Sequence, residues 1–138
     1  VGIDSDADDP IQFLRYLSGP GYQTELIEAS SGGDVQYNRY KVKIPKHALS
    51  EDTYITVRDP GTGYVMCDLE PHGIAFLVPV QFEMDLTGLR WQPYTDWTDY
   101  WFNEETGDWE RQSGTFDGKK IVDSLSHFSR YAAGRAGW

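Results

Sequence analysis

The chain has 138 residues, a length that suits one domain with a single hydrophobic core. Its 22 acidic residues outnumber its 12 lysines and arginines, and the formal net charge of −10 disfavours nucleic acid and anionic membranes as partners. No apolar run approaches the roughly 20 residues that a membrane-spanning helix needs, so membrane insertion is not expected either.

The acidic first ten residues are predicted to form a solvated leader. Asp4, Asp6 and Asp8 have the alternating spacing that opens a calcium-binding loop. Asp9, however, stands where that loop requires Gly, and Arg15 stands where it requires a bidentate Glu. Calcium binding is therefore the weaker alternative for this leader.

The segment 11–17 is predicted to form one short helix. Apolar side chains at its first, fourth and seventh positions recur at the spacing of a helical turn. Asp9-Pro10 before the segment favours a helix start, and a Gly-Pro-Gly sequence after it favours a stop. We therefore divide the chain into a leader with this helix, residues 1–29, and a second unit, residues 30–138.

Beyond residue 30 the apolar pattern changes to a period of two, which is typical of strands with one buried face. The clearest predicted strands cover residues 40–44, 54–58, 65–69, 80–86, 100–103, 108–111, 119–122 and 124–132. Gly107 and Asp117-Gly118 mark hairpin turns, and the segment 88–98 is predicted to cross between sheets. About seven or eight short strands, with turns every 8–12 residues, indicate an all-β antiparallel sandwich.

The reactive residue types do not suggest a metal or cofactor site. Cys67 is the only cysteine, and it alternates with apolar positions, as a buried core thiol does. The histidines His47, His72 and His127 lack partners at metal-ligand spacing, and the first two are predicted to be turn residues. We therefore expect no metal and no cofactor.

Three segments together resemble a ZU-five domain, a module of zonula occludens proteins, netrin receptors and ankyrins. Residues 31–57 carry a Gly-Gly turn, an Ile-Pro-x-x-Ala-Leu corner and a Thr-x-Ile strand. Residues 71–80 match Pro-x-Gly-x-x-Phe-x-x-Pro-Val, and residues 126–131 resemble the terminal His-Phe-Ser strand of the family. The resemblance implies a β-sandwich. Because the hairpin at 100–109 is most similar to that of the secreted prokaryotic relatives, it also implies a secreted or cell-surface location.

In some members of this family the peptide bond before the serine of that tripeptide cleaves itself. By resemblance, Ser129 Oγ would attack the Phe128 carbonyl, His127 would act as base and then as acid, and water would hydrolyse the ester. In a regular strand, however, His127 and Ser129 lie about 6.5–7 Å apart, beyond hydrogen-bond reach. Cleavage therefore requires a bulge or kink at the tripeptide and an oxyanion donor that the sequence does not identify.

Three functions are compatible with the sequence. The leading interpretation is a non-enzymatic module that contacts a protein partner, or a neighbouring domain of the same polypeptide, through strand edges and loops. In this case the tripeptide is a structural strand, with His127 and Phe128 filling the core. The second is an intramolecular serine autoprotease that cuts its own Phe128–Ser129 bond. The third is a glycan-binding sandwich, suggested by the carboxylates Asp96, Asp99, Glu104 and Glu105 near Trp97 and Trp101.

Overall fold

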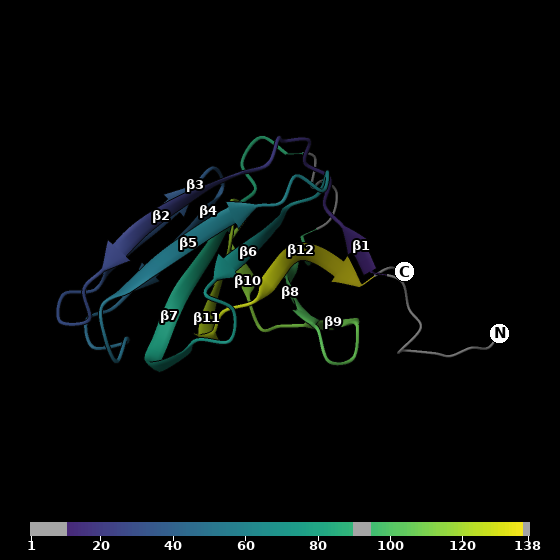
Figure 1. The fold of residues 1–138 in the computed structure, drawn as a ribbon. Helices are drawn as coiled ribbons and strands as arrows, with labels where there is room; N and C mark the ends of the chain where they lie inside the picture. Colours follow the sequence, from purple (N-terminus) through teal and green to yellow (C-terminus); the bar gives the residue numbers. More distant parts are fainter. Residues whose placement is uncertain (1–10, 90–94, 137–138) are drawn as a thin grey trace.

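The computed structural model describes residues 11–89 and 95–136, which form strands and no helix (Figure 1). The strands in chain order are β1 (Ile11–Phe13), β2 (Gly21–Ile27), β3 (Gly33–Tyr37), β4 (Tyr40–Ile44), β5 (Thr53–Asp59), β6 (Met66–Glu70), β7 (Ala75–Asp85), β8 (Thr98–Asn103), β9 (Asp108–Arg111), β10 (Thr115–Phe116), β11 (Lys120–His127) and β12 (Arg130–Ala136). The described part of the chain therefore contains no helix long and apolar enough to cross a membrane.

The strands form two antiparallel sheets that pack face to face. The seven-stranded sheet has the order β2-β5-β6-β12-β8-β9, with β1 also paired to β12. The five-stranded sheet has the order β10-β11-β7-β4-β3. This arrangement confirms the predicted antiparallel sandwich. It also confirms that the segment 88–98 joins the two sheets, because β7 and β8 belong to different ones.

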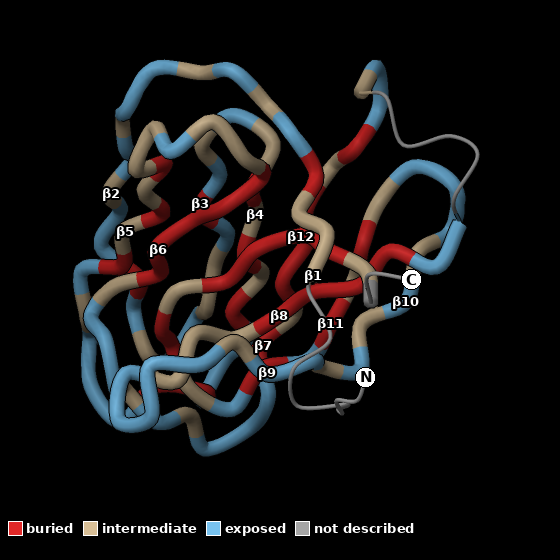
Figure 2. The backbone as a smooth tube through the Cα atoms, turned by 90° about the vertical axis from the view of Figure 1, so that its right-hand side faces the viewer, coloured by how far each residue is buried: buried red, intermediate tan, exposed pale blue. Residues whose placement is uncertain are grey.

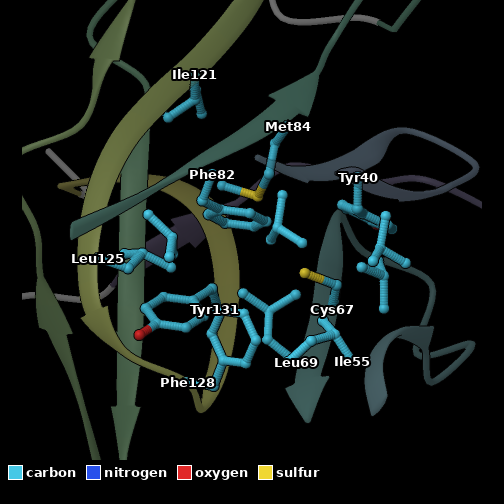
Figure 3. Packing of buried hydrophobic residues seen from close by; sticks show 14 of the residues in the cluster. Tyr40, Ile55, Cys67, Leu69, Phe82, Met84, Ile121, Leu125, Phe128 and Tyr131 are labelled. Atoms are coloured by element: carbon cyan, nitrogen blue, oxygen red, sulfur yellow. The ribbon is translucent and has the colours of Figure 1, made fainter. Parts of the chain in front are cut away.

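The core lies between the two sheets and is filled by alternate residues of the strands. In β4, Tyr40, Val42 and Ile44 are buried, whereas the lysines between them are only partly covered. In Figure 2 the buried positions follow the strands and the exposed positions follow the loops. Figure 3 shows core side chains of both sheets meeting, with Phe82 and Met84 of β7 on one side. The period-two pattern of the sequence is therefore the pattern of this core.

The predicted helix over 11–17 is wrong, because the structure has strand β1 at its start. β1 pairs with the end of β12, from Ile11 opposite Ala136 to Phe13 opposite Gly134. Leu14 continues the pairing: its N–H donates to Ala133 O at 3.1 Å. Leu17, which the helix would bury, is 81% exposed. A helix this short is marginal alone, whereas β12 extends past β6 and offers unpaired backbone groups. The candidate calcium ligands Asp4, Asp6 and Asp8 lie outside the described residues.

Strand β2 belongs to the sandwich although it precedes residue 30. It pairs with β5 along its full length, from Gly21 opposite Asp59 to Ile27 opposite Thr53. Gln23 and Glu25 stand on its core-facing side, opposite the buried Val57 and Ile55. These two polar residues are tolerated because β2 is an edge strand, and they conceal the alternation that would have predicted it. Packing therefore continues across the predicted boundary at residue 30.

The last strand, predicted over 124–132, is two strands in different sheets. β11 ends at His127 in the five-stranded sheet, and β12 begins at Arg130 in the seven-stranded sheet. In Figure 1 a short connection joins the two. The alternation of apolar and polar residues does not reveal this change of sheet, because both strands bury residues of similar type. Phe128 and Ser129 form the crossing itself.

We expect Phe128→Ala to lower the free energy of unfolding by about 3–5 kcal/mol, because the fully buried ring leaves a cavity between the sheets. Leu17→Ala is the matched control, since Leu17 is 81% exposed and its loss should change stability by less than about 0.5 kcal/mol. Urea unfolding followed by tryptophan fluorescence measures both. Equal effects of the two substitutions would contradict this account of the crossing.

Candidate functional site

The tripeptide His127-Phe128-Ser129 lies where the chain leaves one sheet and enters the other. The pairing of β11 with β7 is irregular just before it: Leu125 pairs with Val80, whereas His127 pairs with Ala75. Pro79, which has no N–H to donate, lies within the displaced part of β7. The strand is therefore irregular just before the tripeptide, where self-cleavage would require a bend.

The backbone carbonyls of the tripeptide are all hydrogen-bonded. The N–H of Gly73 donates to Phe128 O at 2.9 Å, and the N–H of Leu69 donates to Ser129 O at 2.9 Å. The hydroxyl of Tyr131 donates to His127 O at 2.9 Å. Gly73 has a φ of 79°, a conformation that glycine adopts at little cost. The turn after β6 thus directs an N–H at the carbonyl that Ser129 would attack.

The side chains of His127 and Ser129 are directed at different partners. Ser129 Oγ donates to Phe102 O at 3.5 Å, a long hydrogen bond. The His127 ring meets Trp101 edge to face, with ring centroids 5.2 Å apart. Phe128 is fully buried and packs edge to face on Phe76, with centroids 4.8 Å apart. In this arrangement the nucleophile and the proposed base are not hydrogen-bonded to each other.

A hollow of about 400 Å³ opens beside the tripeptide. It is lined by His72, Gly73, Trp101, Phe102, Asn103, Glu104, Glu105, His127, Phe128 and Ser129. On its rim, His72 Nδ1 lies 3.6 Å from Glu104 Oε2. The sequence identified the tripeptide but missed Gly73 and Phe102, because their contribution is a backbone group. It also treated His72 only as a turn residue.

The carboxylates and tryptophans proposed for glycan binding do not form one surface. Asp96 is held by Arg135, with Oδ1 2.7 Å from Nε, and Asp99 is completely buried. Of the tryptophans that the structure describes, Trp97 is buried, and Trp101 and Trp109 are only partly exposed. The aromatic platform that the prediction required is therefore not formed by these residues, and glycan binding itself stays a prediction.

The other reactive groups lie apart from the tripeptide. The described ranges contain no group of three or more His, Cys, Asp or Glu side chains that could hold a metal ion. Cys67 is buried in the core, where burial raises the pKa of its thiol. It is therefore a packing residue and not an activated nucleophile.

The comparisons with known proteins leave the family unassigned. A scan of the chain against protein-family models gives no match, and a search of curated proteins finds no relative. The resemblance to the ZU-five domain therefore stays a proposal, and the function is argued from the geometry.

We expect Tyr131→Phe to lower the free energy of unfolding by about 1–2 kcal/mol, because the partly buried carbonyl of His127 loses the Tyr131 hydroxyl as a donor. Tyr16→Phe is the control: its hydroxyl donates to Asn38 Oδ1 at an exposed position, so its loss should cost about 0.5 kcal/mol or less. Urea unfolding measures both, and amide hydrogen exchange at Gly73 reports on the crossing. A Tyr131→Phe protein as stable as the wild type would show that this bond does not hold the crossing.

Proposed function

We propose that the protein is a non-enzymatic β-sandwich module of ZU-five type that docks a protein partner or a neighbouring domain. Supporting this, each side chain of the tripeptide already has a structural contact: Phe128 in the core, His127 on Trp101 and Ser129 on Phe102 O. The resemblance to secreted relatives leads us to propose a location outside the cell or at its surface.

The observation that carries this proposal is an exposed aromatic surface on the outer side of β2 and β5. The register places Tyr22 opposite Arg58 and Leu26 opposite Tyr54, all on the side away from the core. Tyr22 is 58% exposed, Leu26 48% and Tyr54 68%. We call these four residues the β2–β5 face. Tyrosine and arginine are enriched in protein interfaces, which suits a docking role.

Arg58 holds the Tyr22 end of the β2–β5 face in place. The Arg58 guanidinium lies over the Tyr22 ring at 4.8 Å and makes two hydrogen bonds to Glu70 on β6, at 3.0 and 3.2 Å. Thr24 and Thr56, one pair further along, join through their hydroxyls at 2.8 Å. Because these side chains are already ordered, a partner that docks here loses little conformational entropy.

The partner is expected to pack on this face and not to extend the sheet. β2 is the edge strand of the seven-stranded sheet, so its outer backbone groups have no neighbouring strand. Its core-facing residues Gln23 and Glu25 are bound to each other at 2.6 Å. A strand added to this edge would bury the Glu25 carboxylate, which is unfavourable. Charged side chains that point inward are one way in which proteins protect sheet edges from such pairing.

A photoreactive phenylalanine analogue at position 54 should cross-link the protein in its source cells to a partner or to another part of its own polypeptide. The same analogue at Thr106, exposed in the turn between β8 and β9, is the control and should not. Tyr54→Ser should then abolish the association without lowering Tm, because the side chain is exposed. Equal cross-linking from both positions, or unchanged association of the Tyr54→Ser protein, would contradict docking on the β2–β5 face.

The second candidate function is self-cleavage at Phe128–Ser129, which one further observation favours. The N–H of Gly73 already donates to Phe128 O, the atom that becomes the oxyanion when the carbonyl is attacked. The hollow beside the tripeptide would admit the water that the second step consumes. The sequence had required both a bend and such a donor.

In the first step Ser129 Oγ would attack the Phe128 carbonyl carbon and its proton would pass to the base. The carbon–nitrogen bond then breaks, the base returns the proton to the Ser129 amine, and an ester joins Phe128 to Oγ. Water hydrolyses this ester and leaves a carboxylate on Phe128 and a free hydroxyl on Ser129. For His127 to be that base, its ring must leave Trp101 and approach Ser129.

Intact-mass analysis under denaturing conditions tests self-cleavage, since the two pieces then separate. Self-cleavage predicts fragments that end at Phe128 and begin at Ser129, and no fragments for Ser129→Ala. Ser126→Ala, at an exposed position of β11, is the control and should cleave like the wild type. A single full-length mass for the wild type after prolonged incubation would remove this candidate and leave the docking proposal untouched.

A further inference from the structure

Two acidic side chains lie close together between the sheets, away from the tripeptide. Ser113 Oγ donates to Asp123 Oδ1 at 3.3 Å, and the N–H of the next residue, Gly114, donates to Asp99 Oδ1 at 3.0 Å. Asp99 is on β8 of the seven-stranded sheet and is 0% exposed. Asp123 is on β11 of the five-stranded sheet and is 8% exposed. Two ionised carboxylates this deeply buried repel each other and lose their hydration, so the pair requires a compensating positive charge or a proton.

The hydrogen bonds around the pair leave one carboxyl oxygen of Asp99 facing only the other acid. Asp99 Oδ1 accepts the Gly114 N–H at 3.0 Å, and Asp123 Oδ1 accepts the Ser124 N–H at 2.8 Å. Asp99 Oδ2 is buried and receives no N–H or O–H from the residues that the structure describes. Asp123 is the acid that interacts with Asp99, and a hydrogen bond between two carboxyl groups can exist only when one of them is protonated.

Among the residues that the structure describes, no cation on the neighbouring strands compensates this charge. The titratable groups that interact with the pair across the core are Tyr131 on β12 and Cys67 on β6. Both are neutral at physiological pH, because burial raises the pKa of each. Glu83 of β7 is bound to Lys43 and Lys120 on the outer side of its sheet. Arg111 of β9 lies over the ring of Tyr100, the neighbour of Asp99 that points to the opposite side.

A metal ion fits this site poorly. Calcium takes about six to eight oxygen ligands, whereas Oδ1 of each acid is already occupied by an N–H. The hydroxyl of Thr98 is likewise turned to Gly114 O, at 2.8 Å. A proton needs only the two facing oxygens and is therefore the better occupant.

We propose that Asp99 and Asp123 share one proton, and that this acid–carboxylate pair is a clasp between β8 and β11 that weakens as the pH rises. Gly114 is part of the clasp, because a Cβ there would collide with Asp99 Oδ1. The clasp joins the two strands that lead to the tripeptide region, because β8 also carries Trp101 and β11 ends at His127.

The direction of the pH dependence follows from the acid that holds the proton. Burial first, and then the neighbouring Asp123, raise the pKa of Asp99 to about 8. In the unfolded chain the pKa of the same acid is about 4. The clasp therefore contributes its full stability below about pH 4, and this contribution is lost progressively as the pH rises through about 8.

The test is the pH dependence of Tm for the whole chain, comparing the wild type with Asp99→Asn. Asparagine can accept the Gly114 N–H and donate an amide N–H to Asp123, so it imitates the protonated acid without titrating. Between pH 5 and 8 we expect the wild-type Tm to fall by about 3 °C per pH unit relative to Asp99→Asn. At pH 8 the variant should be the more stable protein.

Asp108→Asn is the matched control, because Asp108 is exposed at the start of β9 and its loss removes the same charge. The Tm of Asp108→Asn should depend on pH with the same slope as that of the wild type. If Tm changes with pH equally in the wild type and in Asp99→Asn, the proposal of a shared proton is wrong. So would a rise in wild-type Tm with calcium that Asp99→Asn does not show contradict it, because a cation would then occupy the pair.

A direct measurement covers the case in which Asp99→Asn does not fold. The carboxyl carbons of the wild type, followed by NMR across the pH range, should include one aspartate that titrates near pH 8. If every aspartate titrates below about pH 5, the clasp holds no proton and the proposal fails.

Discussion

The passage of the chain between the sheets at Phe128 and Ser129 is the constraint on which the rest of the structure depends. Before it, β11 completes the five-stranded sheet beside β7; after it, β12 takes the middle of the seven-stranded sheet between β6 and β8. The buried ring of Phe128 fills the space at the crossing. The N–H of Gly73, in the turn after β6, donates to Phe128 O, and the N–H of Leu69, in β6, donates to Ser129 O. The self-cleavage candidate concerns this same segment, whereas docking is proposed on the β2–β5 face of the sandwich that the segment holds together.

The fold could be predicted where one face of a strand is buried and the other is not. β4 and β5 follow this rule, because Val42 and Val57 alternate with residues that are only partly buried. β1 and β2 could not be predicted in this way. β1 exists because β12 leaves backbone groups unpaired, and β2 carries polar residues toward the core at an edge. Both depend on long-range pairing, which a local pattern does not contain.

The sequence drew attention to the tripeptide but did not show its geometry. His127 and Ser129 were identified from the tripeptide, but the bend depends on a register shift against β7, many residues away in the chain. The N–H that donates to Phe128 O belongs to the backbone of Gly73, which no side-chain motif reveals. Asp99 was assigned to a carboxylate cluster because Asp96, Glu104, Glu105 and two tryptophans are close to it in the sequence. Its true partner, Asp123, lies in the other sheet, and only the packing of the sheets brings the two acids together.

The pairing of β1 with β12 determines how the domain responds to mechanical force. Ile11 lies opposite Ala136 and Phe13 opposite Gly134, so polypeptide that continues beyond either strand leaves from one corner of the seven-stranded sheet (Figure 1). Tension applied through that corner would open the short ladder one hydrogen bond at a time, because the two ends are pulled apart across the pair and not along it. β1 is therefore the element that tension would detach first, while β12, paired on both sides further along, would stay in the sheet.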